Sequence, residues 1–159
     1  MKQKNSIYDF KIPALTGGKT IDFEDFRGKK LLIVNTASEC GYTPQYAQLQ
    51  ELYTHFEGKL AIVGCPSNDF GGQEPKEASD IVAFCEKNYG VSFTLTEKLK
   101  IKGDDKHELY EFLQEKSQIA VKWNFQKYFF DENGQLLKVL PSAAEPLSEE
   151  MFLLVDIEL

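Results

Sequence analysis

The sequence contains few cysteines and histidines, and this scarcity excludes two classes of small protein. Its three cysteines, Cys40, Cys65 and Cys85, are too few and odd in number for the disulfide framework of a secreted scaffold. The two histidines, His55 and His107, stand apart from the cysteines, so the spacing of a zinc site is missing. We therefore expect free thiols, no metal and no other cofactor.

Long apolar runs and an excess of positive charge are also missing. No apolar run approaches the roughly 20 residues of a membrane span, and the N-terminal MKQKNSIYDF lacks the apolar stretch of a secretory signal. The net charge of -7 and the pI of about 4.9 disfavour nucleic acid and anionic membranes as partners. These features predict a globular cytoplasmic protein with no nucleic-acid or membrane partner.

Two short apolar segments, 30–37 and 60–65, predict strands that are buried on both faces, as in parallel sheets. The first leads through a loop containing Cys40 to a helix, for which Thr43 is the predicted N-cap and Pro44 the first residue. The apolar positions of this helix recur with a helical period at Leu49, Leu52, Tyr53 and Phe56. Gly58 is placed to end the helix.

The rest of the chain continues the alternation of strands and helices. The pattern first predicts a loop over 66–75, a helix over 76–89 stopped by Gly90, and a short strand near 91–95. A helix opened by Asp104 follows. The chain then forms a hairpin through Asn133-Gly134 between strands 125–131 and 135–140, and a last helix begins after Ser148. No repeat, linker or low-complexity tract interrupts this order. We expect a single α/β domain over residues 1–159 with a mixed sheet flanked by helices.

Cys40 is the candidate nucleophile. It follows a buried strand and precedes a helix N-terminus, where unpaired N–H groups and the helix dipole favour an anion. This position favours the thiolate, which is the reactive form of cysteine. A small buried thiol is the alternative for Cys40, and core packing is the simplest explanation for Cys65 and for Cys85 on its apolar helix face.

Four other residues could contribute to chemistry. The indole N–H of Trp123 and the amide of Asn124 could donate hydrogen bonds to a thiolate, although a single tryptophan more often belongs to a core. His55 and His107 lie on helical segments among charged neighbours, so we expect them to be solvated. Taken alone, these patterns predict an α/β domain with one candidate reactive cysteine.

Three segments resemble the signature motifs of the glutathione peroxidase family. NTASECGYT closely resembles its peroxidatic-site motif, SNDFGGQEP resembles its second signature, and KWNF at 122–125 matches its third, in the same order. The resemblance implies a thioredoxin-like fold and the two-electron reduction of hydrogen peroxide or organic hydroperoxides. It also implies that Cys40 is the peroxidatic thiolate and that Trp123 and Asn124 donate hydrogen bonds to it.

The resemblance further implies how the enzyme is reduced again. AFCEKNYGVSF resembles the segment with the resolving cysteine of the thioredoxin-dependent branch, so Cys85 is expected to condense with the Cys40 sulfenic acid once helix 76–89 opens locally. Thioredoxin, or glutathione, would then reduce the disulfide. The stretch between Leu113 and Val121 lacks an insertion resembling the tetramerisation loop of the animal selenoenzymes, so a monomer is expected.

Two other functions compete with this reading. A redox sensor or relay would use the same two cysteines and pass the disulfide to a partner protein. A thioredoxin-like disulfide exchanger is disfavoured, because the sequence has no Cys-x-x-Cys motif.

The second signature departs from the family pattern. The family's catalytic glutamine falls on Asp69, its usual phenylalanine on Cys65 and its usual nonreactive cysteine on Ser67. An ionised Asp69 facing the sulfur would disfavour the thiolate, whereas a protonated one could donate a hydrogen bond. Alternatively, Asp69 turns away as a loop residue and leaves Asn68, the tryptophan–asparagine pair and backbone N–H groups to hold the thiolate.

Overall fold

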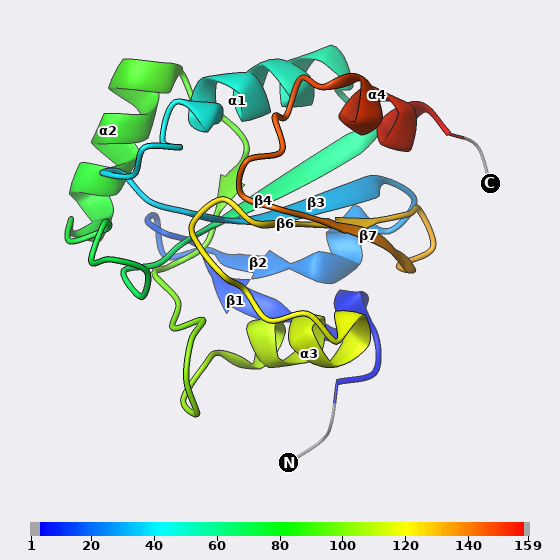
Figure 1. Ribbon diagram of the computed structural model, residues 1–159, viewed down its shortest axis with the longest axis horizontal. Helices are drawn as coiled ribbons and strands as arrows, with labels where there is room; N and C mark the ends of the chain where they lie inside the picture. Colours follow the sequence, from blue (N-terminus) through cyan, green and yellow to red (C-terminus); the bar gives the residue numbers. More distant parts are fainter. Residues whose placement is uncertain (1–3, 158–159) are drawn as a thin grey trace.

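The computed structural model describes residues 4–157, which form three layers with the main sheet in the middle (Figure 1). Three helices cover one face of the sheet: α1 (Gln45–His55), α2 (Ala78–Tyr89) and α4 (Glu149–Asp156). The fourth helix, α3 (Glu108–Ser117), lies on the opposite face beside a small hairpin. The predicted mixed sheet flanked by helices is confirmed.

The central sheet has five strands in the order β5-β4-β3-β6-β7. β3 (Lys30–Thr36) pairs in parallel with β4 (Leu60–Pro66), and β4 pairs in parallel with β5 (Thr94–Leu95). β6 (Lys127–Phe130) runs antiparallel to both β3 and β7 (Leu136–Leu140). Every residue of β3 and β4 is buried, which explains their continuous apolar sequences.

The sheet separates two hydrophobic cores. Because successive side chains of a strand point to opposite faces, Leu32 and Val34 of β3 join the core under α1, α2 and α4, whereas Leu31 and Ile33 join the core under α3. Cys40 and Cys85 both belong to the first core, and Cys65 belongs to the second. The sheet therefore sets Cys65 apart from the other two thiols.

Residues 4–26 contain structure that the sequence pattern did not predict. A hairpin of β1 (Lys11–Pro13) and β2 (Thr20–Asp22) lies between two short 3-10 helices, Ile7–Asp9 and Phe23–Phe26. These elements of three or four residues are too short to show a clear hydrophobic period. They close the second core over α3, where Phe10 packs edge-on against Phe112 with 5.2 Å between ring centroids.

The start of α1 differs from the prediction. The helix begins at Gln45, Pro44 is its N-cap residue, and no side chain caps it. Thr43 was wrongly predicted as the N-cap: its hydroxyl instead accepts a hydrogen bond from the Cys40 N–H (2.9 Å) and donates one to the Ala37 carbonyl (2.8 Å). Thr43 thus shapes the loop that carries Cys40.

The start of α3 was also predicted wrongly. Asp104 lies in a turn, and the helix begins four residues later, at Glu108. The true cap is His107, whose Nδ1 accepts a hydrogen bond from the Leu109 N–H (3.0 Å). Burial lowers the pKa of His107, which favours the neutral ring that this bond requires. His107 is therefore a half-buried structural residue, whereas His55 is exposed as expected.

Two predictions near the C-terminus are confirmed. The β6–β7 hairpin turns at Asn133-Gly134, where Gly134 has a φ of +79° and the Asp131 carboxylate accepts hydrogen bonds from two backbone N–H groups of the turn. The last helix starts after Ser148, whose hydroxyl accepts a hydrogen bond from the Met151 N–H. Within residues 4–157, none of the helices has the length and apolar character needed to cross a membrane.

Candidate active site

Cys40 lies in the loop between β3 and α1, and the residue is 8% exposed. Its sulfur accepts a hydrogen bond from the Tyr42 N–H at 3.3 Å. The sulfur is not part of a disulfide, so it is available to act as a nucleophile. Among the described residues, the Tyr42 N–H is the group that donates a hydrogen bond to the Cys40 sulfur. The side chains of Trp123 and Asn124 do not donate to this sulfur in the structure.

The loop with Cys40 is tied to the second signature segment by three hydrogen bonds. The Glu39 N–H donates to the Gln73 carbonyl (3.0 Å), and the Glu74 carboxylate accepts from the N–H (3.1 Å) and hydroxyl (2.8 Å) of Ser38. Burial raises the pKa of Glu74, while its bonds to Ser38 act in the opposite direction. Glu74 is a buried support of the site that the sequence analysis did not single out, although it lies in the SNDFGGQEP motif.

The third signature segment is held against the same loop. Asn124 is fully buried, and its amide nitrogen donates hydrogen bonds to the Phe70 carbonyl (3.3 Å) and to Oε1 of Gln73 (2.9 Å). Gln73 therefore contacts both the Cys40 loop, through its backbone, and Asn124, through its side chain. No pattern in the sequence singles out Gln73, because its partner lies 51 residues away in the chain.

Asn35 of β3 fixes the orientation of the Trp123–Asn124 segment through its side-chain amide and its backbone carbonyl. The Asn35 amide nitrogen donates to the Trp123 carbonyl (3.0 Å), and the Phe125 N–H donates to the Asn35 carbonyl (2.7 Å). Phe125 has a φ of +66°, an uncommon conformation for a residue with a side chain. Its carbonyl accepts a hydrogen bond from the buried Nζ of Lys127 at 2.7 Å.

Lys127 provides a pH-dependent prediction. Burial lowers the pKa of Lys127 to about 7, from 10.5, so between these values the unfolded state holds a proton that the folded state has lost. Stability should therefore rise with pH in this window, by up to about 1.4 kcal/mol per pH unit. Urea unfolding of the wild type and of Lys127→Met at pH 7 and pH 8.5 measures the effect. The stability of the wild type relative to the variant should increase with pH; an unchanged difference would contradict the assignment.

Trp123 packs where the two cores meet and is positioned by the ring of Phe70 and by a glycine. Its ring lies edge-on to Phe70, with 6.0 Å between centroids. Gly71 has a φ of +69°, and a Cβ built there would lie 2.8 Å from Cη2 of the indole. Gly71 therefore allows the indole to approach the backbone of the second signature segment.

Replacing Gly71 with alanine should displace the indole and lower peroxidase activity about tenfold, because a catalytic group moved by about 1 Å loses much of its effect. Gly72→Ala is a matched control: Gly72 has a φ of +61° and open space around it, so it carries the same backbone cost without the contact. Initial rates of peroxide consumption by the two folded variants test this. Equal rates would show that the position of the indole has no effect on turnover.

Asp69, at the position of the family's glutamine, is bonded to a distant segment. Its Oδ2 accepts hydrogen bonds from the backbone N–H groups of Ile101 (2.7 Å) and Lys102 (3.2 Å). This geometry matches the alternative in which Asp69 serves as a loop residue. The side chain anchors the segment after β5 to the second signature segment.

Asp69→Ala should lower the free energy of unfolding by about 1–3 kcal/mol, because it leaves two backbone donors without their acceptor. Asp69→Asn, which retains a side-chain carbonyl oxygen, should lose less. Thermal or urea unfolding measures both, and the peroxide reaction of the folded variants should stay within about twofold of the wild type. A large gain or loss of that rate with unchanged stability would instead give Asp69 a place in the reaction.

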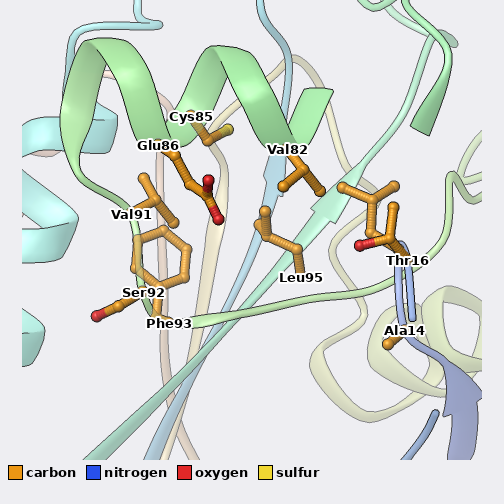
Figure 2. A pocket seen from close by; sticks show the side chains of 10 residues that line it. Ala14, Thr16, Val82, Cys85, Glu86, Val91, Ser92, Phe93 and Leu95 are labelled. Atoms are coloured by element: carbon orange, nitrogen blue, oxygen red, sulfur yellow. The ribbon is translucent and has the colours of Figure 1, made fainter. Parts of the chain in front are cut away.

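Cys85 and Cys65 are both buried, but only Cys85 lines a pocket among those found in the described residues. Cys65 is fully buried at the end of β4, and burial raises its pKa to about 12. Cys85 is 1% exposed, and burial raises its pKa to about 11, but the residue lines a cavity of about 220 Å³ between α2 and the 91–95 segment (Figure 2). All three thiols are free. Within residues 4–157, no cluster of three or more histidine, cysteine or acidic side chains could hold a metal.

Comparison with known proteins identifies the family. The model of the glutathione peroxidase family matches residues 7–114. A glutathione peroxidase of Lactococcus lactis subsp. cremoris (strain MG1363) is 40% identical over 151 residues, which cover 92% of this chain and 94% of the relative. Glutathione peroxidase-like peroxiredoxin GPX5 of Chlamydomonas reinhardtii is 44% identical over 136 residues, covering 82% and 84% of the two chains.

The fold is shared as well. The crystal structure of T. cruzi GPX1 matches with a TM-score of 0.70 and 30% identity, covering 95% of this chain and 97% of that one. The thioredoxin-like fold that the three signatures implied is therefore confirmed. The chain belongs to the glutathione peroxidase family and is a thiol peroxidase, an oxidoreductase.

Proposed function

We propose that this chain reduces hydrogen peroxide or organic hydroperoxides with Cys40 as the nucleophile. The thiolate attacks one peroxide oxygen, the O–O bond breaks, and water or an alcohol leaves as Cys40 becomes a sulfenic acid. The observation that carries this proposal is the network around Cys40: Gln73 connects the loop that holds the reduced thiol to the buried Asn124 amide. In the proposed reaction, small movements in this network bring Trp123 and Asn124 to the thiolate as donors.

Cys85 is the proposed resolving residue. Its thiol condenses with the Cys40 sulfenic acid, so an S–S bond forms, the S–O bond breaks and water is released. Cys85 is 1% exposed on α2, so the helix must open locally before the two sulfurs can meet. The open pocket beside Cys85 supports this step, because this side of α2 is not covered by other parts of the protein that would have to move when the helix opens.

Thioredoxin is the proposed reductant, with glutathione as the weaker alternative. A disulfide between Cys40 and Cys85 is a substrate for a protein dithiol. Glutathione carries two carboxylates, yet the chain has no lysine or arginine between Lys30 and Lys59, the stretch that includes Cys40. Three cysteines are an odd and sparse set that suits a reducing compartment, and we propose a cytoplasmic location. The stretch between Leu113 and Val121 has no insertion resembling the tetramerisation loop of the animal selenoenzymes, so we propose a monomer.

The test is peroxide consumption at equal enzyme concentration with two reducing systems, thioredoxin with its reductase and NADPH, or glutathione with its reductase and NADPH. We expect faster turnover with thioredoxin. Faster turnover with glutathione would overturn the proposed reductant. No turnover with either, together with a disulfide that forms readily, would favour the sensor or relay function.

A further inference from the structure

Tyr46 connects the segments that carry Cys40, Asn124 and Cys85. It lies in the first turn of α1, six residues after Cys40, and is fully buried. Its ring packs edge-on against Phe125, next to Asn124, with 5.5 Å between centroids. Its ring also lies near that of Tyr89, at the end of the helix that contains Cys85, with 5.7 Å between centroids.

The hydroxyl of Tyr46 is buried without a hydrogen-bond partner among the described residues. The polar groups beside it are the Cys85 thiol and the Thr36 hydroxyl, which is itself buried and unpartnered. In the reduced protein these groups are neighbours that lack the geometry of completed hydrogen bonds. A buried hydroxyl without a partner destabilises the fold, and phenylalanine would fill the same space without this cost.

Resting on the proposed function, we propose that Tyr46 is a positioning residue for the resolving step: while α2 is still closed, its hydroxyl donates a hydrogen bond to the Cys85 sulfur as that thiol loses its proton. The Cys85 sulfur then attacks the Cys40 sulfenic sulfur, the S–S bond forms, and the hydroxide that leaves takes a proton and departs as water. Cys85 is oxidised and the sulfenic sulfur is reduced. Tyr46 keeps its own proton throughout.

The electrostatic surroundings of Cys85 show why a donor is needed there. Burial disfavours its thiolate most, and the carboxylates of Glu74 and Glu86 add to this, whereas the Tyr46 side chain favours the thiolate. Burial also raises the pKa of Tyr46 well above its ordinary value, so the hydroxyl stays a donor at neutral pH. Tyr46 is thus the group beside Cys85 that can stabilise the attacking anion.

The chain contains a matched control for this proposal. On the opposite face of the sheet, the Tyr110 hydroxyl is also buried, unpartnered and adjacent to a buried cysteine, in this case Cys65. Tyr110→Phe therefore makes the same chemical change beside a thiol without a proposed role. If the hydroxyls were only structural, Tyr46→Phe and Tyr110→Phe would affect the reaction equally.

The experiment follows a single turnover of the reduced full chain after one equivalent of hydrogen peroxide. Rapid quenching and mass spectrometry measure sulfenic acid formation and disulfide formation as separate rates. Tyr46→Phe should slow disulfide formation about tenfold, which is the loss expected when one hydrogen bond to an anion is removed. The rate of sulfenic acid formation should stay unchanged. The pH profile of disulfide formation should also move to higher pH, and Tyr110→Phe should match the wild type in both rates.

Disulfide formation in Tyr46→Phe at the wild-type rate and with the wild-type pH profile would overturn the proposal while leaving the proposed function intact. Equal slowing by Tyr110→Phe would overturn it as well. If the wild type itself formed no disulfide between Cys40 and Cys85, the resolving step of the proposed function would fail, and this inference with it. Thermal unfolding of both variants, expected at or above the wild-type midpoint, excludes a folding defect.

Discussion

Cys40→Ser should abolish peroxide reduction, lowering the rate by about three orders of magnitude or more. A serine hydroxyl is not ionised at neutral pH, and oxygen cannot accept the peroxide oxygen as sulfur does when it becomes a sulfenic acid. The substitution changes a single atom at a loop position, so the fold should be preserved. Peroxide consumption in the thioredoxin-coupled assay measures the loss.

Cys65→Ser makes the same chemical change in the other core and serves as the control. Cys65 is fully buried at the end of β4, on the opposite face of the sheet from Cys40. The folded Cys65→Ser protein should therefore retain its peroxide reaction, even if it is less stable. If Cys40→Ser kept wild-type turnover while Cys65→Ser lost it, the first signature would have been assigned to the wrong residue.

Cys85→Ser should separate the two halves of the reaction. In this variant, peroxide should oxidise Cys40 to the sulfenic acid at a rate within about twofold of the wild-type rate, because Cys85 has no part in breaking the O–O bond. Turnover with thioredoxin should fall by about two orders of magnitude, since the sulfenic acid then has no intramolecular thiol to attack it. A sulfenic acid on Cys40, trapped by a dimedone-type reagent, should accumulate in the variant and not in the wild type.

A single kinetic result would contradict this role of Cys85. If Cys85→Ser turned over with thioredoxin at the wild-type rate, the reductant would attack the Cys40 sulfenic acid directly. The helix α2 would then have no reason to open during the cycle. The open pocket beside Cys85 would then have no role in the cycle.

The sheet and most helices could be predicted because their signals are local. The buried strands β3 and β4 appear as continuous apolar runs, and Ser148 and Asn133-Gly134 each mark a boundary through their own backbone preferences. Thr43 and Asp104 carry the same kind of local signal, yet both predictions were wrong. Thr43 bonds to the Cys40 loop, and the cap of α3 is a histidine.

The site could be predicted only in part, because its contacts join distant segments. The motifs pointed to Cys40, Trp123 and Asn124, but the sequence shows no sign that Gln73 would reach Asn124. The same limit applies to Asp69, whose partners lie 32 and 33 residues further along the chain. A carboxylate can accept hydrogen bonds from any nearby backbone N–H, so its residue type alone does not say which segment it anchors.

The most direct test of the two-cysteine cycle is mass spectrometry of the fully reduced wild-type protein after one equivalent of hydrogen peroxide. The account predicts an intact mass lower by two hydrogens and, after proteolysis without reductant, a peptide pair that joins Cys40 to Cys85 while Cys65 stays free. A protein that instead gained one oxygen on Cys40 and kept Cys85 as a free thiol, or that formed its disulfide through Cys65, would contradict it.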